Sequence, residues 1–232
     1  MKIQLFGRST EELKKLVVRL GFEIVYKNPD VIISYGGDGT LLSAEREFPG
    51  VPKLPIRADK FCNKCPKHLD HVILEKLQKN QLELKEYKKL ETEVLFKKFY
   101  ALNDFVVRNS DATHTIRFRI SNGKLLIGDG IVISTPFGST GYFKSITQKT
   151  FDNGFGIAFN NLTEKTDPII LQDKDSIIFQ LKRGKATLSF DNSPDIFTID
   201  EGSELIFKLS DQIAKIYSNT SLRCPDCKII RD

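Results

Sequence analysis

The chain has 232 residues, of which 40% are hydrophobic and 28% are charged, enough for one large domain or two smaller ones with hydrophobic cores. Its formal net charge of +5 is mild, so it suits an anionic small substrate and is too weak to indicate a nucleic-acid partner. No apolar run approaches the ~18 residues of a membrane-spanning helix, and the N-terminus lacks the pattern of a signal peptide, which predicts a cytoplasmic protein without a membrane partner.

The first part of the chain alternates between predicted strands and helices. Lys2–Phe6 reads as a strand, and Ser9 with Glu12 forms the pattern of a capping box for the helix that follows. Phe22–Tyr26 and Val31–Ser34 are two further predicted strands. This succession indicates an α/β sheet with parallel strands, in which ligands bind at the carboxyl ends of the strands.

A glycine-rich turn, Gly36-Gly37-Asp38-Gly39-Thr40, follows the third predicted strand and precedes a predicted helix. We expect its glycines to adopt positive φ and to let a ligand approach the backbone closely. The amides at the start of the helix favour an anion such as phosphate. A carboxylate at Asp38 would repel such a ligand unless it holds a metal ion or accepts a proton from an attacking hydroxyl. The alternative is a simple Gly-Asp-Gly turn in which Asp38 caps the helix.

Beyond about Asn80 the pattern changes to short strands in close succession. We therefore predict an α/β, Rossmann-like domain over residues 1–80 and an all-β, sandwich-like domain over residues 81–217. A C-terminal tail follows over residues 218–232.

A second motif lies inside the predicted β domain, where Gly128–Tyr142 reads GDGIVISTPFGSTGY. A strand leads there into a turn rich in glycine and hydroxyl residues, and then into a short helix. Tyr142 can stack on a base or a nicotinamide ring. Upstream, Asn103 and Asp104 place an amide beside a carboxylate between two strands, which suits ribose hydroxyls or an amide group.

These three segments together resemble the NAD kinase family. Its members share a GGDGT loop, an Asn-Glu or Asn-Asp pair after a strand, and a D-G-x-x-x-S-T-P-x-G-S-T-A-Y segment. The first of these motifs also occurs in diacylglycerol and sphingosine kinases, whereas STPxGST is far more specific. The order and spacing of the motifs match over most of the chain, between about Lys2 and Leu209.

The resemblance implies an α/β domain that carries the GGDGT loop and a β-rich domain that binds NAD. It implies transfer of the terminal phosphate of ATP, or of polyphosphate, to the 2′-hydroxyl of the adenosine ribose of NAD, which yields NADP. A divalent metal ion such as Mg²⁺ would accompany ATP. Members of the family are commonly dimers or tetramers, so a homo-oligomer is expected.

The resemblance also assigns roles by position. Asp38 would be the catalytic carboxylate that accepts or orients the hydroxyl proton, with Gly37 and Gly39 at the phosphates. The residues that would bind the nucleotide are Asn103, Asp104, Asp129, Phe137, Thr140, Gly141, Tyr142 and Ser145.

Some positions depart from the family pattern. Phe61–Cys65 stands where the family has a G-x-L-G-F-L segment, and Ile146–Lys149 stands where Gly-Gly-Pro is usual. Gly141 replaces an alanine, and Ser43 and Ile127 occupy positions where many members have a basic residue. Beside the NAD kinase interpretation, two rival functions stay open: a lipid or sphingoid kinase of the GGDGT group, and a nucleotide-binding regulator without catalysis.

All four cysteines lie in two Cys-x-x-Cys pairs, Cys62 with Cys65 and Cys224 with Cys227. Two such turns supply the four thiolates of a tetrahedral zinc site, which a reducing cytosol favours over disulfides. We therefore predict one structural Zn²⁺ held by all four cysteines, which would return the tail to the first domain. Redox or disulfide pairing and unpaired structural thiols are the alternatives. His68 and His71 flank the first pair as alternative ligands, although packed or solvated histidines are the commoner case.

Overall fold

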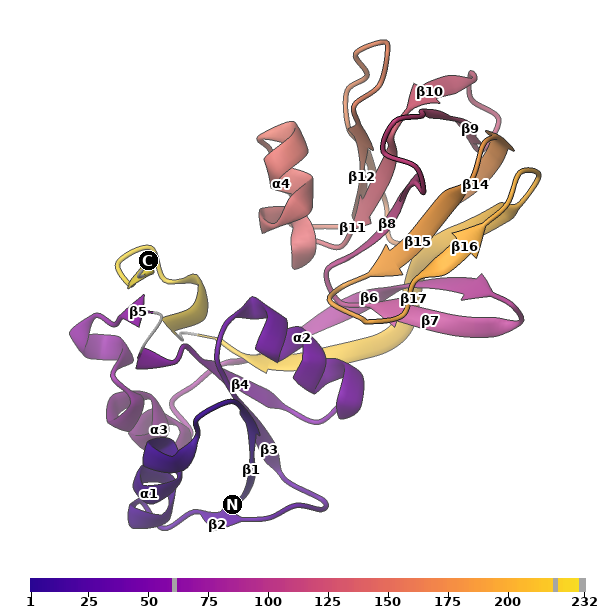
Figure 1. Cartoon of the computed structure of the whole chain (residues 1–232). Helices are drawn as coiled ribbons and strands as arrows, with labels where there is room; N and C mark the ends of the chain where they lie inside the picture. Colours follow the sequence, from indigo (N-terminus) through magenta and orange to yellow (C-terminus); the bar gives the residue numbers. More distant parts are fainter. Residues whose placement is uncertain (60–61, 219–220, 230–232) are drawn as a thin grey trace. The chain divides into compact units, whose positions relative to one another are not determined.

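The computed structural model describes residues 1–59, 62–218 and 221–229, which form two compact units (Figure 1). The N-terminal unit comprises Met1–Tyr87 together with Ala214–Asp232, and the β unit comprises Lys88–Ile213. The C-terminal residues thus belong to the same unit as the first strands. None of the helices in the described parts is long and apolar enough to cross a membrane.

The N-terminal unit is built on a parallel sheet. Its strands lie in the order β17-β4-β3-β1-β2, with bounds β1 Lys2–Gly7, β2 Glu23–Ile24, β3 Val31–Tyr35, β4 Lys53–Ile56 and β17 Glu204–Tyr217. Only the end of β17 joins this sheet, where Ile216 pairs with Lys53. All residues of β3 are buried, as expected for a parallel strand covered on both faces.

Helices cover both faces of this sheet. Leu13 and Val17 of α1 (Glu11–Arg19) share one core with Ile73 of α3 (Asp70–Gln78), and this core includes the alternate β3 residues Val31 and Ile33. Helix α2 (Asp38–Glu47) lies on the other face (Figure 1). The predicted α/β architecture of this part of the chain is therefore confirmed.

The predicted start of the first helix is wrong by one residue. Ser9 adopts φ 59° and does not cap the helix, which begins at Glu11 after Thr10. Glu12 does not bond back to Ser9 but pairs with Lys15, with 2.6 Å between Oε1 and Nζ. The left-handed turn at Ser9 thus replaces the capping box.

A buried ion pair joins α2 to β4. Lys53 and Glu45 have side chains that are 0% and 3% exposed, and the Lys53 ammonium contacts both the Glu45 carboxylate and the carbonyl of Phe48. Lys53 points away from the core that holds Leu54 and Ile56, as the alternation of a strand requires. The pair therefore fixes α2 against the sheet from which the GGDGT loop emerges.

The β unit is a sandwich of two antiparallel sheets. One sheet has the order β13-β12-β11-β8-β15-β16, with bounds β8 Asp104–Asn109, β11 Gly130–Ser134, β12 Phe155–Asn160, β13 Ile169–Leu171, β15 Ala186–Phe190 and β16 Phe197–Ile199. The other pairs the first part of β17 with neighbouring strands, with bounds β6 Leu84–Val94, β7 Lys97–Ala101, β9 Ile116–Ile120, β10 Leu126–Gly128 and β14 Ser176–Arg183.

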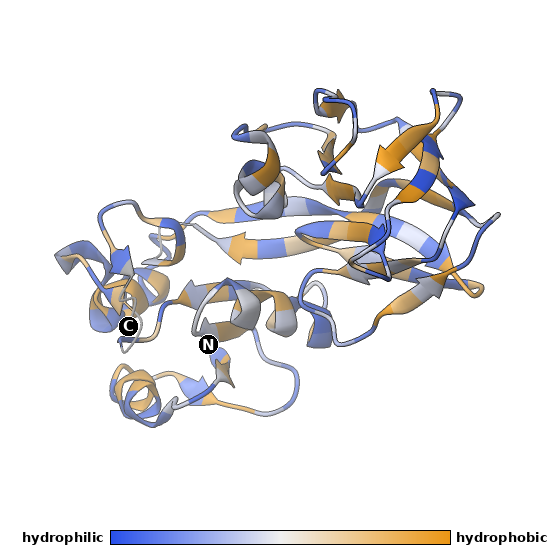
Figure 2. Ribbon diagram, turned by 45° about the horizontal axis from the view of Figure 1, so that its top comes forward, coloured by the Kyte–Doolittle hydropathy of each residue, from blue (hydrophilic) through white to orange (hydrophobic). Residues whose placement is uncertain are grey.

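Phenylalanine side chains fill the space between these two sheets. The ring of Phe105 in β8 lies 5.5 Å from that of Phe207 in β17, and Phe118 stacks on Phe179 at 5.2 Å. Hydrophobic and hydrophilic residues alternate along these strands (Figure 2). The predicted second, β-rich domain with a sandwich-like fold is therefore confirmed.

The short helix α4 (Tyr142–Thr147) covers the outer face of the first sheet. Phe143 of α4 is fully buried against Val132 of β11 and Ala158 of β12. The 3-10 turn η3 (Gly138–Thr140) connects β11 to this helix. The second sequence motif therefore runs from β11 through a turn onto the outside of the sandwich.

We expect Lys53→Met to lower the free energy of unfolding by about 3–5 kcal/mol, because it leaves the Glu45 carboxylate buried without its cation. The double variant Lys53→Met with Glu45→Leu should recover most of this loss, since neither charge then stays buried. Urea unfolding of the two variants measures both values. A single variant within about 1 kcal/mol of wild type would contradict a buried ion pair.

Candidate active site and metal site

The GGDGT loop lies at the carboxyl end of β3, as predicted. The N–H of Gly36 donates to the carbonyl of Ile56 at 2.9 Å, which holds the loop to the end of β4. Gly37 is the extended N-cap residue, with φ −105°, and α2 begins at Asp38. The first amides of a helix have no intrahelical acceptor, so this end of α2 favours an anionic ligand.

One prediction about this loop is wrong, because Gly36, Gly37 and Gly39 do not have positive φ. The alternative in which Asp38 caps the helix does not hold either, because Gly37 is the N-cap residue. The glycines instead allow other atoms to come close to the backbone. A Cβ on Gly36 would lie 2.2 Å from Oγ1 of Thr40, whereas one on Gly37 would meet nothing within 4 Å. The side-chain-free surface of Gly37 therefore lies open to a ligand.

Asp38 lies between two arginines of the same unit. Its side chain is 50% exposed, with Oδ2 at 4.0 Å from Nη2 of Arg57 and Oδ1 at 3.7 Å from Nε of Arg223. The carboxylate is thus accessible to a substrate and surrounded by positive charge.

Arg57 is held in place by the C-terminal segment. Its backbone N–H donates to Oγ of Ser221 at 3.0 Å, and its Nη2 donates to the carbonyl of Leu222. Its buried Nε has no hydrogen-bond partner within the described part of the chain. Arg57 follows β4, so the rule that ligands gather at strand carboxyl ends was the signal that could have found it. No comparable signal marks Arg223.

The second half of the predicted site is the loop before β8. The carboxylate of Asp191 accepts hydrogen bonds from the N–H groups of Leu102, Asn103 and Asp104 at 2.9, 2.7 and 3.2 Å. Thr135, at the end of β11, donates its N–H to the Asn103 carbonyl at 2.9 Å and its hydroxyl to the Leu102 carbonyl at 2.6 Å. The loop is therefore fixed from both sides.

Asn103 is also confined by the second motif. A Cβ on Gly138 would lie 2.2 Å from the carbonyl oxygen of Asn103, so only glycine fits there. The side-chain Oδ1 of Asn103 is buried and has no hydrogen-bond partner among the described residues. A buried acceptor without a partner is costly, and a ligand with an N–H or O–H donor would relieve that cost.

Asp104 and Asp191 form a pair of neighbouring buried carboxyls. Burial, and then the charge of Asp191, raises the pKa of Asp104 from its usual 3.8 to about 7. Burial also raises the pKa of Asp191, although the three N–H donors oppose this effect. Asp191 was missed at the sequence level because it lies 87 residues from Asp104.

The remaining predicted nucleotide contacts lie along β11 and α4. Phe137 is buried, Thr140 is exposed, and Gly141 is the N-cap residue of α4. The hydroxyl of Ser145 donates to the carbonyl of Tyr142 at 2.7 Å, so this hydrogen bond lies within α4.

Asp129 lies apart from Asn103. It precedes the Gly130 end of β11, whereas Asn103 contacts Thr135 beyond the opposite end. Asn161 donates to Oδ2 of Asp129 at 3.1 Å, and its neighbour Asn160 lies 3.3 Å from the hydroxyl of Tyr142. The predicted contacts in the β unit are thus spread along the whole length of β11.

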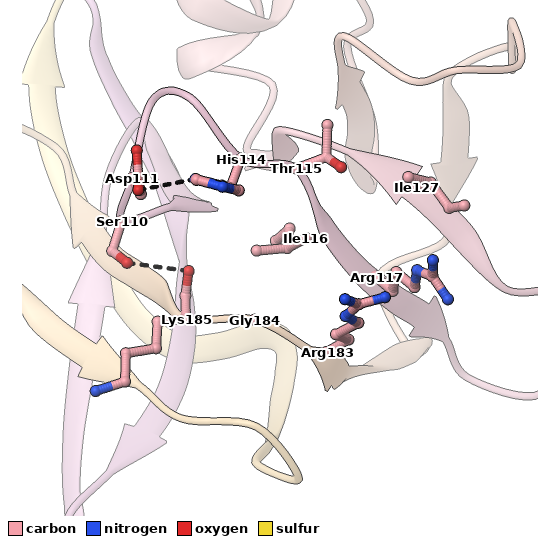
Figure 3. Close-up of a pocket in the computed structure, with 10 residues that line it drawn as sticks. All are labelled: Ser110, Asp111, His114, Thr115, Ile116, Arg117, Ile127, Arg183, Gly184 and Lys185. Atoms are coloured by element: carbon pink, nitrogen blue, oxygen red, sulfur yellow. Dashed lines mark hydrogen bonds and ion pairs between the residues drawn. The ribbon is translucent and has the colours of Figure 1, made fainter.

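A separate cavity of about 500 Å³ lies elsewhere in the β unit (Figure 3). Arg117 and Arg183, which pair across strands β9 and β14, both line it, and His114 contacts Asp111 at 2.9 Å. None of the residues predicted from the motifs lines this cavity. Its basic side chains favour an anionic ligand, but the residues of the two sequence motifs lie elsewhere.

The candidate metal site lies in the N-terminal unit, where the C-terminal segment meets residues 62–68. Strand β5 (Cys62–Asn63) pairs with β18 (Lys228–Ile229), and the 3-10 turn η2 (Pro66–His68) follows. Four potential ligand atoms lie within 4.8 Å of one another, from Cys65, His68, Cys224 and Cys227. None of the four cysteines forms a disulfide.

This group differs from the predicted set by one residue. Cys62 is buried in β5 and is not part of it, and His68 takes the fourth place. Nδ1 of His68 lies 3.2 Å from Sγ of Cys65 and 3.3 Å from Sγ of Cys227, and the two sulfurs are 3.5 Å apart. Ligand atoms around a tetrahedral zinc ion lie ~3.5–3.8 Å apart, given Zn–S and Zn–N bonds of ~2.3 and ~2.0 Å.

Comparisons with known proteins agree with one another. The NAD kinase of Sulfurisphaera tokodaii is 30% identical over 237 residues, which cover 93% of this chain and 94% of that protein. NAD kinase 2 of Listeria monocytogenes is 33% identical over 156 residues, or 61% of this chain and 58% of that protein. No family profile matches the chain.

Two solved structures share the fold. An NAD kinase from Archaeoglobus fulgidus in complex with ATP superposes with a TM-score of 0.75 and 18% identity, covering 94% of each chain. Yeast NADH kinase complexed with NADH gives a TM-score of 0.79 and 14% identity, covering 95% of this chain and 84% of that one. At these identities the similarity establishes the architecture alone.

The raised pKa of Asp104 predicts a specific pH dependence. The folded protein holds this proton between pH 3.8 and about 7, whereas the unfolded chain does not, so the stabilisation is present at low pH and is lost as pH rises through 7. Relative to Asp104→Asn, wild type should therefore lose up to roughly 4 kcal/mol of unfolding free energy over that range. Urea unfolding between pH 4 and 8.5 measures the difference.

The exposed residue Asp167 supplies the control, since Asp167→Asn should leave the difference from wild type flat across the same range. A flat difference for Asp104→Asn as well would show that the Asp104 carboxyl titrates normally in the folded protein.

Proposed function

Because this chain belongs to the NAD kinase family, we propose that it transfers the terminal phosphoryl group of ATP, or of polyphosphate, to the 2′-hydroxyl of the adenosine ribose of NAD. The product is NADP. The observation that carries the proposal is the placement of Asp38, half exposed at the first turn of α2 and flanked by Arg57 and Arg223 at 4.0 and 3.7 Å. A phosphoryl-transfer site needs such a carboxylate, positive charge and an open helix N-terminus together.

Asp38 accepts the proton of the attacking 2′-hydroxyl in this mechanism. Its side chain is 50% exposed, and a Cβ on the neighbouring Gly37 would meet nothing within 4 Å. Loss of the proton makes the ribose oxygen a better nucleophile for the terminal phosphorus. The two arginines and the amides at the start of α2 offset the negative charge of the phosphates, which would otherwise disfavour an acidic residue at this point.

The donor phosphates would bind at the start of α2. The buried Nε–H of Arg57, which has no partner in the described residues, is a donor available to a phosphate oxygen. Divalent ions such as Mg²⁺ take oxygen ligands, and Asp38 is the carboxylate that the loop offers to one. When bound with ATP, that ion would neutralise part of the charge on the transferred group.

The acceptor would bind in the β unit through Asn103 and Asp104. The buried acceptor atom of Asn103 and the fixed loop around it support this role. Asp129, Phe137, Thr140, Gly141, Tyr142 and Ser145 stay predictions for the rest of the dinucleotide. Of the two solved structures that share the fold, one is in complex with ATP and the other with NADH. These complexes support a nucleotide donor and a dinucleotide acceptor.

The two rival functions have less support. A lipid or sphingoid kinase would share the GGDGT loop, but the Sulfurisphaera tokodaii relative, whose alignment covers 93% of this chain, is an NAD kinase. A regulator without catalysis would have no need of an accessible Asp38. We also expect a cytoplasmic homodimer or homotetramer, which light scattering can test.

Asp38→Asn should lower kcat by about 10²–10⁴, because an amide cannot accept the hydroxyl proton. NAD affinity and thermal stability should stay near those of wild type. A coupled assay for NADP formation with ATP, and in parallel with polyphosphate, measures the rate. The exposed variant Asp152→Asn serves as the matched control. Wild-type protein that forms no NADP with either donor would overturn the proposed function, and an active Asp38→Asn would overturn the role of Asp38.

Asn103→Ala should weaken NAD binding by on the order of 1–3 kcal/mol, since it removes a buried acceptor that the acceptor substrate would satisfy. Binding of ATP should change little. Calorimetry with each nucleotide measures both effects, and Asn153→Ala, at an exposed position, is the control. Equal NAD affinity in Asn103→Ala and wild type would remove this residue from the acceptor site.

A further inference from the structure

The cluster of Cys65, His68, Cys224 and Cys227 has the chemistry of a zinc site. Three thiols and one imidazole converge on a single point, and His68 and Cys227 are buried, at 3% and 6% exposure. The backbone N–H of Cys65 donates to Sγ of Cys227 at 3.4 Å, a contact that stabilises a thiolate. Soft sulfur with imidazole selects zinc over magnesium or calcium, which take oxygen ligands.

Hydrogen bonding alone does not account for this arrangement. Nδ1 of His68 faces the sulfurs of Cys65 and Cys227 at nearly equal distances, 3.2 and 3.3 Å. A neutral imidazole nitrogen is either one donor or one acceptor, so it satisfies at most one strong partner in that plane. A metal ion at the centre contacts all four atoms at once, which explains their mutual spacing.

The local secondary structure is too small to hold the segment without further support. Strands β5 and β18 have two residues each, and they join parts of the chain that are far apart in sequence. Two-stranded pairs are marginal by themselves even when they are longer. Binding of zinc would supply the missing free energy, since a site of this kind does not exist in the unfolded chain.

The ligands adjoin residues that contact the proposed active site. Ser221 and Leu222 accept hydrogen bonds from Arg57, and Arg223, 3.7 Å from Asp38, directly precedes the ligand Cys224. We propose that these four residues bind one structural zinc ion, and that the ion positions the segment 221–223 beside Asp38. The site has no open ligand position, so the ion takes no part in the chemistry. The effect on catalysis rests on the proposed function, whereas metal binding does not.

The ligand set is tested by metal content. Wild type, purified under reducing conditions without chelators, should contain close to one zinc per chain, and so should the control Cys62→Ala. His68→Ala and Cys224→Ser should lose more than about 100-fold in zinc affinity, beyond the ~10–100-fold that loss of an outer partner costs. His68→Cys should restore binding with four thiolates. Zinc lost from Cys62→Ala and retained in His68→Ala would overturn this ligand set, as would metal-free wild type.

Cobalt substitution keeps the test decisive if a ligand variant does not fold. Wild type and Cys62→Ala, each reconstituted with Co²⁺, should show identical tetrahedral spectra with the thiolate-to-cobalt intensity of three Co–S bonds. An intensity of four bonds in wild type that falls to three in Cys62→Ala would show that Cys62 is a ligand, and the proposed set would be wrong.

The positioning role is tested by hydrogen exchange. Removal of zinc with a chelator should speed exchange at the amide of Arg57, which donates to Ser221, and added ZnCl₂ should reverse the change. Amides of β8 and β11 in the β unit are the internal control. Unchanged exchange at Arg57 in zinc-free protein would overturn the positioning role. If zinc-loaded protein makes no NADP, the proposed function fails while metal content and exchange still decide this inference.

Discussion

The candidate active site of the N-terminal unit depends on the contact between Arg57 and the C-terminal segment. Arg57 bonds to Ser221 and Leu222, 164 and 165 residues further along the chain. This contact closes the carboxyl edge of the parallel sheet, where β3 delivers Asp38 and β4 delivers Arg57. Without residues 221–223, Asp38 would face one arginine in place of two, and that arginine would lack its acceptors. Residues from the first quarter of the chain and from its C-terminal segment therefore form the site together.

In the β unit, a carboxylate holds the loop that carries Asn103. Asp191 gathers three successive N–H groups, and Thr135 and Gly138 confine the same loop from the other side. The result is a firmly held Asn103, whose side-chain oxygen has no hydrogen-bond partner among the residues that the structure describes. In both units, contacts between distant parts of the sequence hold the residues that surround one polar side chain, Asp38 in the N-terminal unit and Asn103 in the β unit. Rigid placement of this kind is what phosphoryl transfer requires.

Local patterns in the sequence predicted the elements and the motifs, whereas the long-range contacts could not be predicted. The apolar run Val31–Ser34 followed by glycines placed Asp38 at the end of a buried strand, because this depends on neighbouring residues alone. The prediction of the first helix start was wrong because Ser9 has a left-handed backbone conformation and does not cap the helix. The metal ligands were ambiguous because Cys65 belongs both to a Cys-x-x-Cys and to a Cys-x-x-His spacing. Arg223 and Asp191 act across more than 80 residues, which no local pattern reveals.

The discontinuity of the N-terminal unit has a consequence for how the protein is made. Domains generally fold as they leave the ribosome, the earlier part of the chain first. Here the β unit, Lys88–Ile213, is contiguous and has emerged before the N-terminal unit can be finished. The end of β17, which pairs with β4 through Ile216, and the partners of Arg57 are synthesised after it. During translation, the edge of the parallel sheet at β4 therefore stays unpaired until the end of β17 is made. The surroundings of Asp38 are completed last.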